Sequence, residues 1–291
     1  MSFRAAACSI SRSAQGRLER SPPSARVLAV FEHACDLVTV DGDVIAVVTP
    51  RIGDGPLNVV VDEESMAFSD VEPGMPARVD KDRLQFSALE IVLDRAVVWE
   101  PRPDWEALRA RRTRVLVRLP LVRHLCLQLA PSDSFLALLE RTSGKDVRQR
   151  VILATARSGA RALGAGWEAD RVWLQEGTAQ LAGLGGGLTP AGDDFLAGVM
   201  LWAWLAHPRP DLFCRIVVEA AISRTTTLSA ALLRTAARGE CGSAWHALLA
   251  ALAWGDYVEL AEMLRVVLSQ GGTSGADALS GFLWMARGSG R

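Results

Sequence analysis

A glycine-rich segment, GGGLTPAGDDFLAG at residues 185–198, has the residue types of a small-anion site. Thr189 is a natural N-cap, and Pro190 suits the first position of a helix. Backbone N–H groups at a helix start attract anions, and glycines allow a ligand to approach them closely. We therefore predict an anion-binding helix start. Its predicted ligand contacts are Gly185, Gly186, Gly187, Thr189 and Gly192.

Two adjacent aspartates, Asp193 and Asp194, fall in the first turn of that helix. Acidic residues in a first turn also complement the helix dipole, which is their structural interpretation. Neighbouring helical residues point about 100° apart, so one of the pair should face a pocket or the core. A buried carboxylate needs a partner such as Mg²⁺ or an arginine. The pattern therefore predicts catalytic or Mg²⁺-binding aspartates.

A second segment, GGTSGADALSGFL at residues 271–283, repeats the glycine pair, the hydroxyl residue and the pattern D-x-L-x-G. The pattern begins at Asp194 in the first segment and at Asp277 in the second. The spacing of Ser274 and Asp277 also fits a capping box, the structural alternative. We expect both helix starts to face one site. Asp277 is then its third catalytic or Mg²⁺-binding residue, and Thr273 and Ser274 bind the anion.

Between the two segments lies SRTTTLS at residues 223–229. Three consecutive threonines are poor residues for a helix interior, so we expect a break that exposes hydroxyl and N–H groups. Thr227 or Ser229 also suits the N-cap of the following helix, and the sequence favours neither role. The anion-binding residues predicted in this segment are Arg224, Thr226, Thr227 and Ser229.

The sequence lacks the residue patterns of a zinc site, a disulfide framework, a P-loop and a covalent nucleophile. The four histidines and five cysteines are scattered, without the spacing of a zinc site or a disulfide framework. Any metal should therefore be a hard cation such as Mg²⁺, held by oxygen ligands. The glycine-rich segment lacks the lysine of a P-loop, and no nucleotide or organic cofactor is indicated. No G-x-S-x-G or Cys–His pattern indicates a covalent nucleophile.

Composition limits the class of protein. The chain has 291 residues, 49% of them hydrophobic, and a net charge of −1, which excludes a disordered chain. The balanced charge argues against a nucleic-acid partner. The longest strongly apolar run, residues 195–206, is too short to span a membrane. Since the N-terminus shows no signal-peptide pattern, we expect a cytoplasmic protein.

The hydrophobic pattern changes along the chain from β-type to helical. Residues 1–24 are rich in Ser, Arg and Ala, and we predict a flexible arm there. Short Val-rich runs between turn signals over residues 25–103 predict a small antiparallel β-barrel or sandwich. Residues 104–291 predict a larger, mainly α-helical domain, in which Asp104 caps the first helix and Pro120 interrupts it. The fold class is therefore α+β.

Six arginines cluster in the first helical region. They indicate a solvated helix face or a subunit contact, and they lack the interleaved aromatic residues of a nucleic-acid platform. These arginines are Arg109, Arg111, Arg112, Arg114, Arg118 and Arg123.

Several segments resemble the AllH-type subunit of oxamate carbamoyltransferase, a family long described only as a domain of unknown function. They are GGGLTPAGDDFLAG (185–198), TTTLSAALLRTAARGE (225–240), GGTSGADALSGFL (271–283), RVLAVFEHACDLVTV (26–40) and GDGPLNVVV (53–61). The resemblance implies a multi-subunit transferase of purine (allantoin) nitrogen catabolism. That enzyme converts oxalurate and phosphate to oxamate and carbamoyl phosphate. The resemblance also implies a hetero-oligomer with other carbamoyltransferase subunits. It leaves open which subunit is catalytic.

Three functions agree with these residues. In a carbamoyl- or phosphoryl-transfer subunit, the glycines bind phosphate or carboxylate and the aspartates orient the nucleophile or hold Mg²⁺. In a Mg²⁺-dependent hydrolase built on a helical bundle, the aspartates activate a water molecule. In a non-catalytic scaffold or ligand-binding subunit, the glycines pack helices and the aspartates only cap them.

Overall fold

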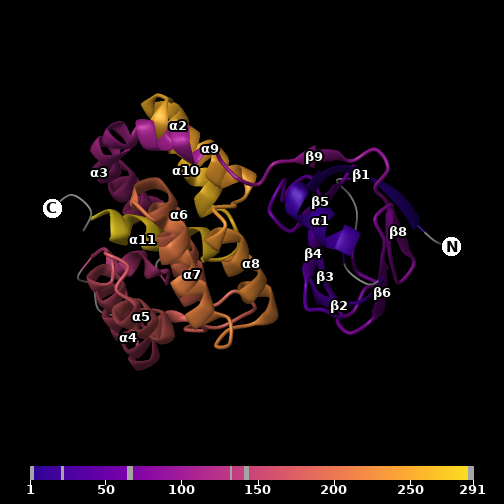
Figure 1. Cartoon of the computed structure of the whole chain (residues 1–291), viewed down its shortest axis with the longest axis horizontal. Helices are drawn as coiled ribbons and strands as arrows, with labels where there is room; N and C mark the ends of the chain where they lie inside the picture. The colour runs from indigo at the N-terminus through magenta and orange to yellow at the C-terminus, as the bar shows by residue number, and fades with distance from the viewer. Residues whose placement is uncertain (1–2, 21–22, 64–67, 132, 141–143, 288–291) are drawn as a thin grey trace. The chain divides into compact units, whose positions relative to one another are not determined.

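A computed structural model describes residues 3–20, 23–63, 68–131, 133–140 and 144–287. The chain forms two compact units. The first contains residues 1–101 and 241–243, and the second contains residues 102–240 and 244–291. Figure 1 shows that the strands lie in the first unit and that all helices but α1 lie in the second.

The first unit is a closed β-barrel. Its strands are β1 (Phe3–Ser11), β2 (Ser24–Val30), β3 (Ala34–Thr39), β4 (Val44–Val48), β5 (Asn58–Val61), β6 (Pro76–Val79), β7 (Arg83–Phe86) and β8 (Leu89–Val92). They follow the order β5-β4-β3-β2-β6-β7-β8-β1, and pairing of β1 with β5 closes the barrel. A further strand, β9 (Val97–Trp99), pairs with β1.

The barrel is mixed, which corrects the prediction of an antiparallel barrel or sandwich. The pairs β1–β8, β1–β9 and β4–β5 are parallel, and the other pairs are antiparallel. Local turn signals predict hairpins, in which consecutive strands are antiparallel. Parallel neighbouring strands need a longer connection, and the turn signals in the sequence do not predict such pairs.

The prediction of a flexible N-terminal arm is wrong for residues 3–20, which form β1 and α1 (Arg12–Arg20). Ala5 and Ala7 of β1 are buried in the barrel core together with Leu18 of α1. Alanine contributes little to the hydrophobic alternation by which a strand is recognised. Its small side chain nevertheless suits the interior of a barrel, where little space remains.

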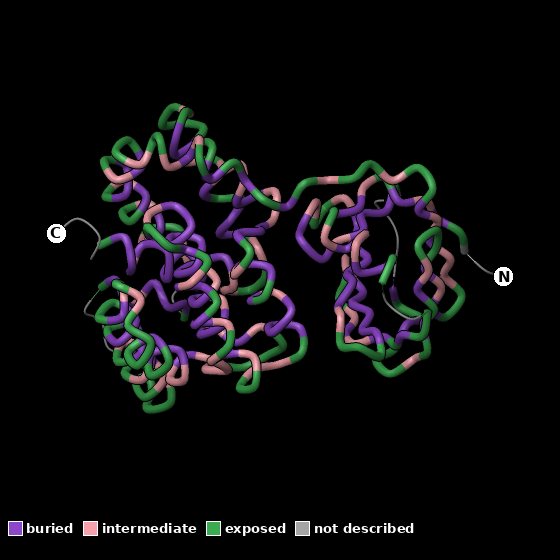
Figure 2. The backbone as a smooth tube through the Cα atoms, in the orientation of Figure 1, coloured by how far each residue is buried: buried purple, intermediate pink, exposed green. Residues whose placement is uncertain are grey.

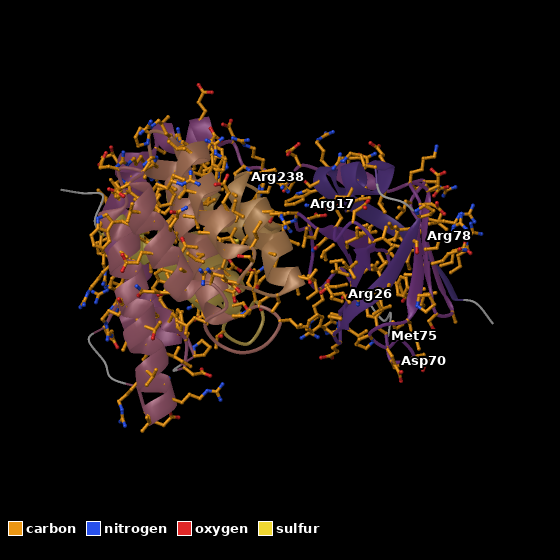
Figure 3. All side chains as sticks on the ribbon, turned by 60° about the horizontal axis from the view of Figure 1, so that its bottom comes forward. Arg17, Arg26, Asp70, Met75, Arg78 and Arg238 are labelled. Carbon is orange, nitrogen blue, oxygen red and sulfur yellow. The ribbon has the colours of Figure 1, made fainter. Side chains whose placement is uncertain are left out.

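Alternate residues of the barrel strands form its core. Figure 2 colours the buried residues of these strands purple. Val27, Leu37 and Ile45 are fully buried there. Arg17 of α1, labelled in Figure 3, is also buried and donates to the carbonyl oxygen of Pro56 at 3.3 Å. Helix α1 therefore belongs to the packed unit.

The second unit is helical. Its elements are α2 (Trp105–Ala110), α3 (Arg112–Leu129), the 3₁₀-helix η1 (Phe135–Leu138), α4 (Val147–Ala165), α5 (Arg171–Leu181), α6 (Ala191–Ala206), α7 (Pro210–Ala221), α8 (Thr227–Ala237), α9 (Ser243–Ala253), α10 (Tyr257–Leu268) and α11 (Ser274–Ala286). Within the described residues, none of these helices has the length and apolar character needed to cross a membrane. Helices α6 and α11 are buried along most of their length and form the centre of this unit (Figure 1).

Asp104 caps α2 as predicted, because its Oδ1 accepts from Ala107 N at 3.0 Å. The helix boundaries after α2 differ from the prediction. The first helix ends at Ala110, and α3 continues through Pro120 without interruption. Proline removes one backbone donor, but the buried apolar face of α3, which includes Val115, outweighs that loss.

The arginine-rich region is more than a solvated face, because several of its side chains bind helix ends. Arg109 Nε donates to the carbonyl oxygen of Trp204, near the end of α6, at 2.7 Å. Arg118 donates to the carbonyl oxygens of Ala251 and Gly255, at the end of α9, each at 2.7 Å. The last carbonyls of a helix lack partners within the helix and carry partial negative charge. These arginines therefore fasten α2 and α3 to their neighbours.

Candidate functional site

Two glycines allow α6 and α11 to cross at backbone contact. A Cβ atom on Gly198 would lie 1.8 Å from the carbonyl oxygen of Ala278, and one on Gly281 would lie 2.0 Å from that of Phe195. Neither position has room for a larger residue. The contacts are reciprocal, because each glycine meets the carbonyl that follows the motif aspartate of the other helix. The glycines of the repeated D-x-L-x-G pattern thus allow α6 and α11 to pack closely against each other.

Gly192 and Gly275, two residues before the motif aspartates, are also packing positions. A Cβ atom on Gly192 would lie 2.0 Å from the carbonyl oxygen of Leu181, at the end of α5. One on Gly275 would lie 1.8 Å from that of Val267, in α10. Gly192, which we expected to bind an anion, therefore contacts a neighbouring helix.

The two helix starts meet through their hydroxyl residues. The N-caps are Pro190 for α6 and Thr273 for α11, and neither makes a side-chain capping hydrogen bond. Thr189, which we expected to cap α6, lies with its Oγ1 3.2 Å from Oγ of Ser274. This hydrogen bond joins the two glycine-rich segments that share the D-x-L-x-G pattern.

A cavity of about 450 Å³ opens beside these helix starts. It is lined by Asp133, Phe135, Lys145, Asp146, Arg148, Gln149, Ile152, Leu153, Gly185, Gly186, Thr189, Ala191 and Thr273. Both glycine-rich segments thus contribute to one concave surface, and four of the predicted anion-binding residues line it. They are Gly185, Gly186, Thr189 and Thr273.

Sequence reasoning missed the charged residues of this cavity: Lys145, Asp146 and Arg148 come from the start of α4, and Asp133 precedes η1. Lys145 and Arg148 supply two positive charges, matched in number by Asp133 and Asp146. Asp146 is engaged as the N-cap of α4, where its Oδ1 accepts from Gln149 N at 2.8 Å. One signal was present in the sequence, because Lys145 is one of only two lysines among 32 basic residues.

Asp193 is buried and holds the glycine-rich loop. Its Oδ1 accepts from Gly183 N at 3.0 Å, and its Oδ2 accepts from the hydroxyl of Thr225. Burial raises the pKa of Asp193, whereas the hydrogen bonds from Thr225, Gly183 and Ser229 lower it. The side chain joins the loop before α6 to the segment before α8 and does not line the cavity.

Asp277 is fully buried and ties η1 to α11. Its Oδ1 accepts from Phe135 N at 2.6 Å, while Ser280 Oγ donates to the carbonyl oxygen of the same residue at 2.7 Å. Burial raises the pKa of Asp277 to about 6, against hydrogen bonds from Phe135 N–H and Thr273, which lower it. Its Oδ2 has no hydrogen-bond partner.

Asp194 is close enough to both of these carboxylates for their charges to act on it. Its pKa is raised to about 8, mainly by burial; a hydrogen bond from Ser274 lowers it, and the charges of Asp277 and Asp193 raise it. Its Oδ2 is buried without a hydrogen-bond partner. A pKa above 7 favours the protonated form of this carboxyl at neutral pH, and Asp194 does not line the cavity.

The three aspartates do not form a group that could hold a metal ion. Within the described part of the chain, no group of three or more His, Cys, Asp or Glu side chains is placed to hold a metal ion. Oxygens of Asp193 and Asp277 instead accept from separate backbone N–H groups. This arrangement does not support the predicted Mg²⁺ site at Asp193, Asp194 and Asp277.

Comparison with known protein families identifies both parts of the chain. Residues 181–286 match the family described as oxamate carbamoyltransferase subunit AllH, and residues 6–98 match the AllH family N-terminal domain. The chain belongs to the AllH family. Neither a curated protein nor a solved structure matches it. The AllH matches include both glycine-rich segments, whereas Lys145 and Arg148 of the cavity lie outside them.

In this AllH family member, the SRTTTLS segment supports the glycine-rich loop. Thr226, rather than Thr227 or Ser229, is the N-cap of α8, and its Oγ1 accepts from Ser229 N at 3.0 Å. The Thr226 hydroxyl also donates to the carbonyl oxygen of Leu188. The predicted anion-binding residues that do not line the cavity are Gly187, Gly192, Arg224, Thr226, Thr227, Ser229 and Ser274.

Proposed function

We propose that this chain is a subunit of an oxamate carbamoyltransferase-type enzyme and that the cavity beside α6 and α11 binds one of its small anions. Membership of the AllH family supports the first part. One observation carries the second: Gly186, Thr189 and Thr273, from two separate helix starts, line a single cavity. Helix starts with exposed backbone N–H groups and glycines are suited to phosphate and carboxylate.

The proposed reaction converts oxalurate and phosphate to oxamate and carbamoyl phosphate. A phosphate oxygen forms a bond to the ureido carbonyl carbon, the bond from that carbon to the oxamate nitrogen breaks, and this nitrogen takes up a proton. Both substrates and both products are anions, which require positive charge and hydrogen-bond donors. Lys145, Arg148 and the hydroxyl of Thr189 supply these groups at the cavity. Other subunits complete the enzyme.

The aspartates act in this proposal by holding the helix starts in place. Asp194 is hydrogen-bonded to Ser274, which in turn meets Thr189 at the cavity wall. Asp193 and Asp277 fix the glycine-rich loop and η1. Positioning of this kind contributes to catalysis because reacting groups must be held in the correct geometry.

Gly186 gives a specific test of the anion site. A Cβ atom at this position meets no atom within 4 Å, so a larger side chain fits the fold, and Gly186 lines the cavity. We expect Gly186→Val to weaken phosphate and oxamate binding at least about tenfold, since it blocks close approach to the loop backbone. Calorimetric titration of the purified chain measures this, and thermal unfolding checks that the fold is intact.

Two matched controls accompany this test. Gly272→Val places the same side chain at another loop glycine with open surroundings, outside the cavity lining, and should bind both anions as the wild type does. Arg148→Ala should weaken binding, whereas Arg150→Ala, on the same helix but not in the lining, should not. Equal affinities of wild type, Gly186→Val and Arg148→Ala would refute an anion site in this cavity.

A non-catalytic scaffold is the second candidate. The close packing of Gly198 and Gly281 and the internal hydrogen bonds of Asp193 and Asp277 are what a purely structural role requires. In that case the wild-type chain binds neither phosphate nor oxamate. A Mg²⁺-dependent hydrolase instead requires that the chain alone hydrolyse a carbamoyl or amide substrate when Mg²⁺ is added.

A further inference from the structure

A second cavity, of about 500 Å³, lies between α3 and α10 of the helical unit. It is lined by Ala110, Arg111, Thr113, Arg114, Val117, Arg118 and Tyr257. None of these residues lines the first cavity. We call the part formed by Arg111, Arg114, Val117, Arg118 and Tyr257 the α3–α10 surface.

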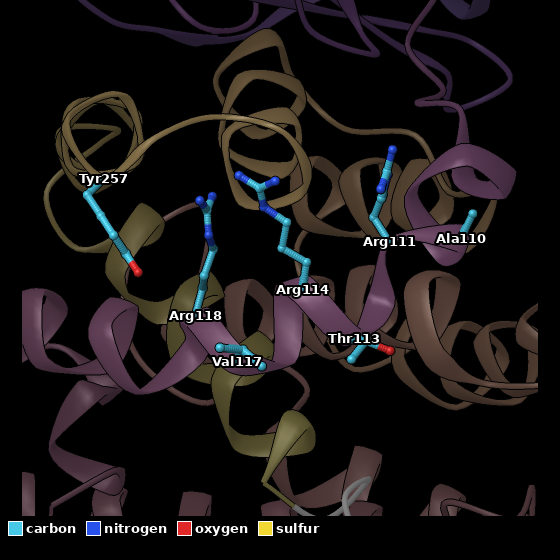
Figure 4. A pocket seen from close by; sticks show the side chains of 7 residues that line it. All are labelled: Ala110, Arg111, Thr113, Arg114, Val117, Arg118 and Tyr257. Atoms are coloured by element: carbon cyan, nitrogen blue, oxygen red, sulfur yellow. The ribbon is translucent and has the colours of Figure 1, made fainter.

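The three arginines of this surface act together because of their spacing. Arg114 and Arg118 are four residues apart and therefore lie on one face of α3, and Arg111 directly precedes this helix. Figure 4 shows their guanidinium groups rising from the same side of α3, with Tyr257 reaching toward this side from α10. The guanidinium of Arg118 lies 5.4 Å from the centre of the Tyr257 ring.

Backbone carbonyls orient two of the guanidinium groups of the surface, and within the described residues no carboxylate forms an ion pair with them. Arg118 donates to the carbonyl oxygen of Ala251, and Arg114 donates to that of Gly255 at 2.9 Å, both at the end of α9. A helix end carries only about half of one negative charge, far less than two guanidinium groups. No carboxylate lines the cavity, and within the described residues none forms an ion pair with Arg111, Arg114 or Arg118.

Exposed apolar side chains surround these charges. Val117 is 75% exposed and Tyr257 is 66% exposed, and the neighbouring Val258 is 76% exposed. A site for a small free anion has no need of exposed aliphatic groups. Arginine and tyrosine beside apolar contacts are the residue types that contribute most to protein–protein interfaces.

We propose that the α3–α10 surface binds another subunit of the same enzyme, through a segment that presents Asp or Glu carboxylates beside apolar residues. The arginine forks hydrogen-bond the carboxylates, and Val117 and Tyr257 contact the apolar part. This inference rests on the proposed membership of a multi-subunit carbamoyltransferase. It does not depend on anion binding at the first cavity.

Variants at two exposed positions test the surface while sparing the contacts that fasten α9. Arg111→Glu reverses a charge, and Val117→Asp places a carboxylate against the apolar part of the proposed partner segment. The controls make the same substitutions outside the surface: Arg215→Glu, at an exposed position of α7, and Val172→Asp, at an exposed position of α5. All four variants and the wild type are purified, checked by thermal unfolding and titrated with the separately produced carbamoyltransferase subunits.

We expect Arg111→Glu and Val117→Asp each to raise the Kd for a partner subunit about 30-fold or more, and the two controls to leave it unchanged. The wild-type Kd should rise with salt concentration, since charge pairing contributes to the contact. Unchanged affinity of both surface variants would overturn this inference alone. Self-association of the wild type through this surface, or phosphate binding that Arg111→Glu abolishes, would also overturn it. If the wild type binds no other subunit, the proposed membership of the enzyme fails as well.

Discussion

At the scale of single residues, Asp194 is a carboxyl group whose pKa departs far from its usual value. Its pKa is raised to about 8, first by burial and further by the charges of Asp277 and Asp193. A neutral carboxyl group avoids the large cost of a buried charge and can still accept the hydrogen bond from Ser274. The folded protein therefore keeps a proton that the unfolded chain releases well below neutral pH.

This difference predicts a pH dependence of stability that Asp194→Asn removes. Below about pH 4 the carboxyl is protonated in both states, so it adds no pH dependence. From about pH 4 to pH 8 only the unfolded state releases the proton, and the free energy of unfolding falls by up to about 1.4 kcal/mol per pH unit. Asparagine cannot ionise, so the variant should lose less stability than the wild type over this range.

Urea denaturation at pH 5, 6, 7 and 8 measures this effect. The difference in unfolding free energy between Asp194→Asn and the wild type should shift in favour of the variant as the pH rises. Asp277 also has a raised pKa and contributes its own pH dependence of stability in both proteins. The difference between the two proteins therefore isolates the contribution of Asp194. Parallel pH profiles for the two proteins would show that Asp194 is ionised at neutral pH in the folded state.

At the scale of helices, the crossing of α6 and α11 determines where the cavity forms. The reciprocal contacts of Gly198 and Gly281 bring the helix backbones together, and the bond between Thr189 and Ser274 joins their starts. The glycine-rich loop then lies beside the start of α4, which supplies Arg148. A change that separates the two helices should therefore affect both stability and the cavity.

Gly198→Ala tests this crossing. The added Cβ would lie 1.8 Å from the carbonyl oxygen of Ala278, so the helices must move apart. We expect a loss of about 1–3 kcal/mol or more in unfolding free energy, measured by denaturant titration. Gly164→Ala in α4 is the matched control, because its Cβ meets nothing within 4 Å; alanine there should be neutral or stabilising by up to about 1 kcal/mol. Equal stabilities of the two variants would contradict the close crossing.

Local sequence signals predict the helix positions in the second unit. They predict only part of the candidate site. The apolar run after Pro190 and the second D-x-L-x-G pattern locate α6 and α11 to within a residue. The role of Thr189 was not predictable, because its partner Ser274 is 85 residues away. Lys145 and Arg148 reach the cavity through tertiary packing of α4, which no local pattern reports.

At the scale of the whole molecule, long-range pairing explains the main error about the fold. Strand β1 pairs with β5 and β8, whose paired residues lie 49 to 86 positions away along the chain, and these pairs close the barrel. Turn signals and alternation describe neighbours in sequence, so they predicted the hairpins but not the strand that completes the barrel. The segment Cys241–Ser243 likewise belongs to the first unit, where Ser243 N donates to the carbonyl oxygen of Asp54 at 2.9 Å.

The central claim is that two related helix starts form one site for a small anion. A crystal structure of the chain soaked with phosphate and with oxamate tests it most directly. The account predicts one bound anion in the cavity beside α6 and α11, in contact with the loop backbone at Gly186, the hydroxyl of Thr189 and the guanidinium of Arg148. An empty cavity at saturating concentrations of both anions, or anions bound only elsewhere on the chain, would contradict it.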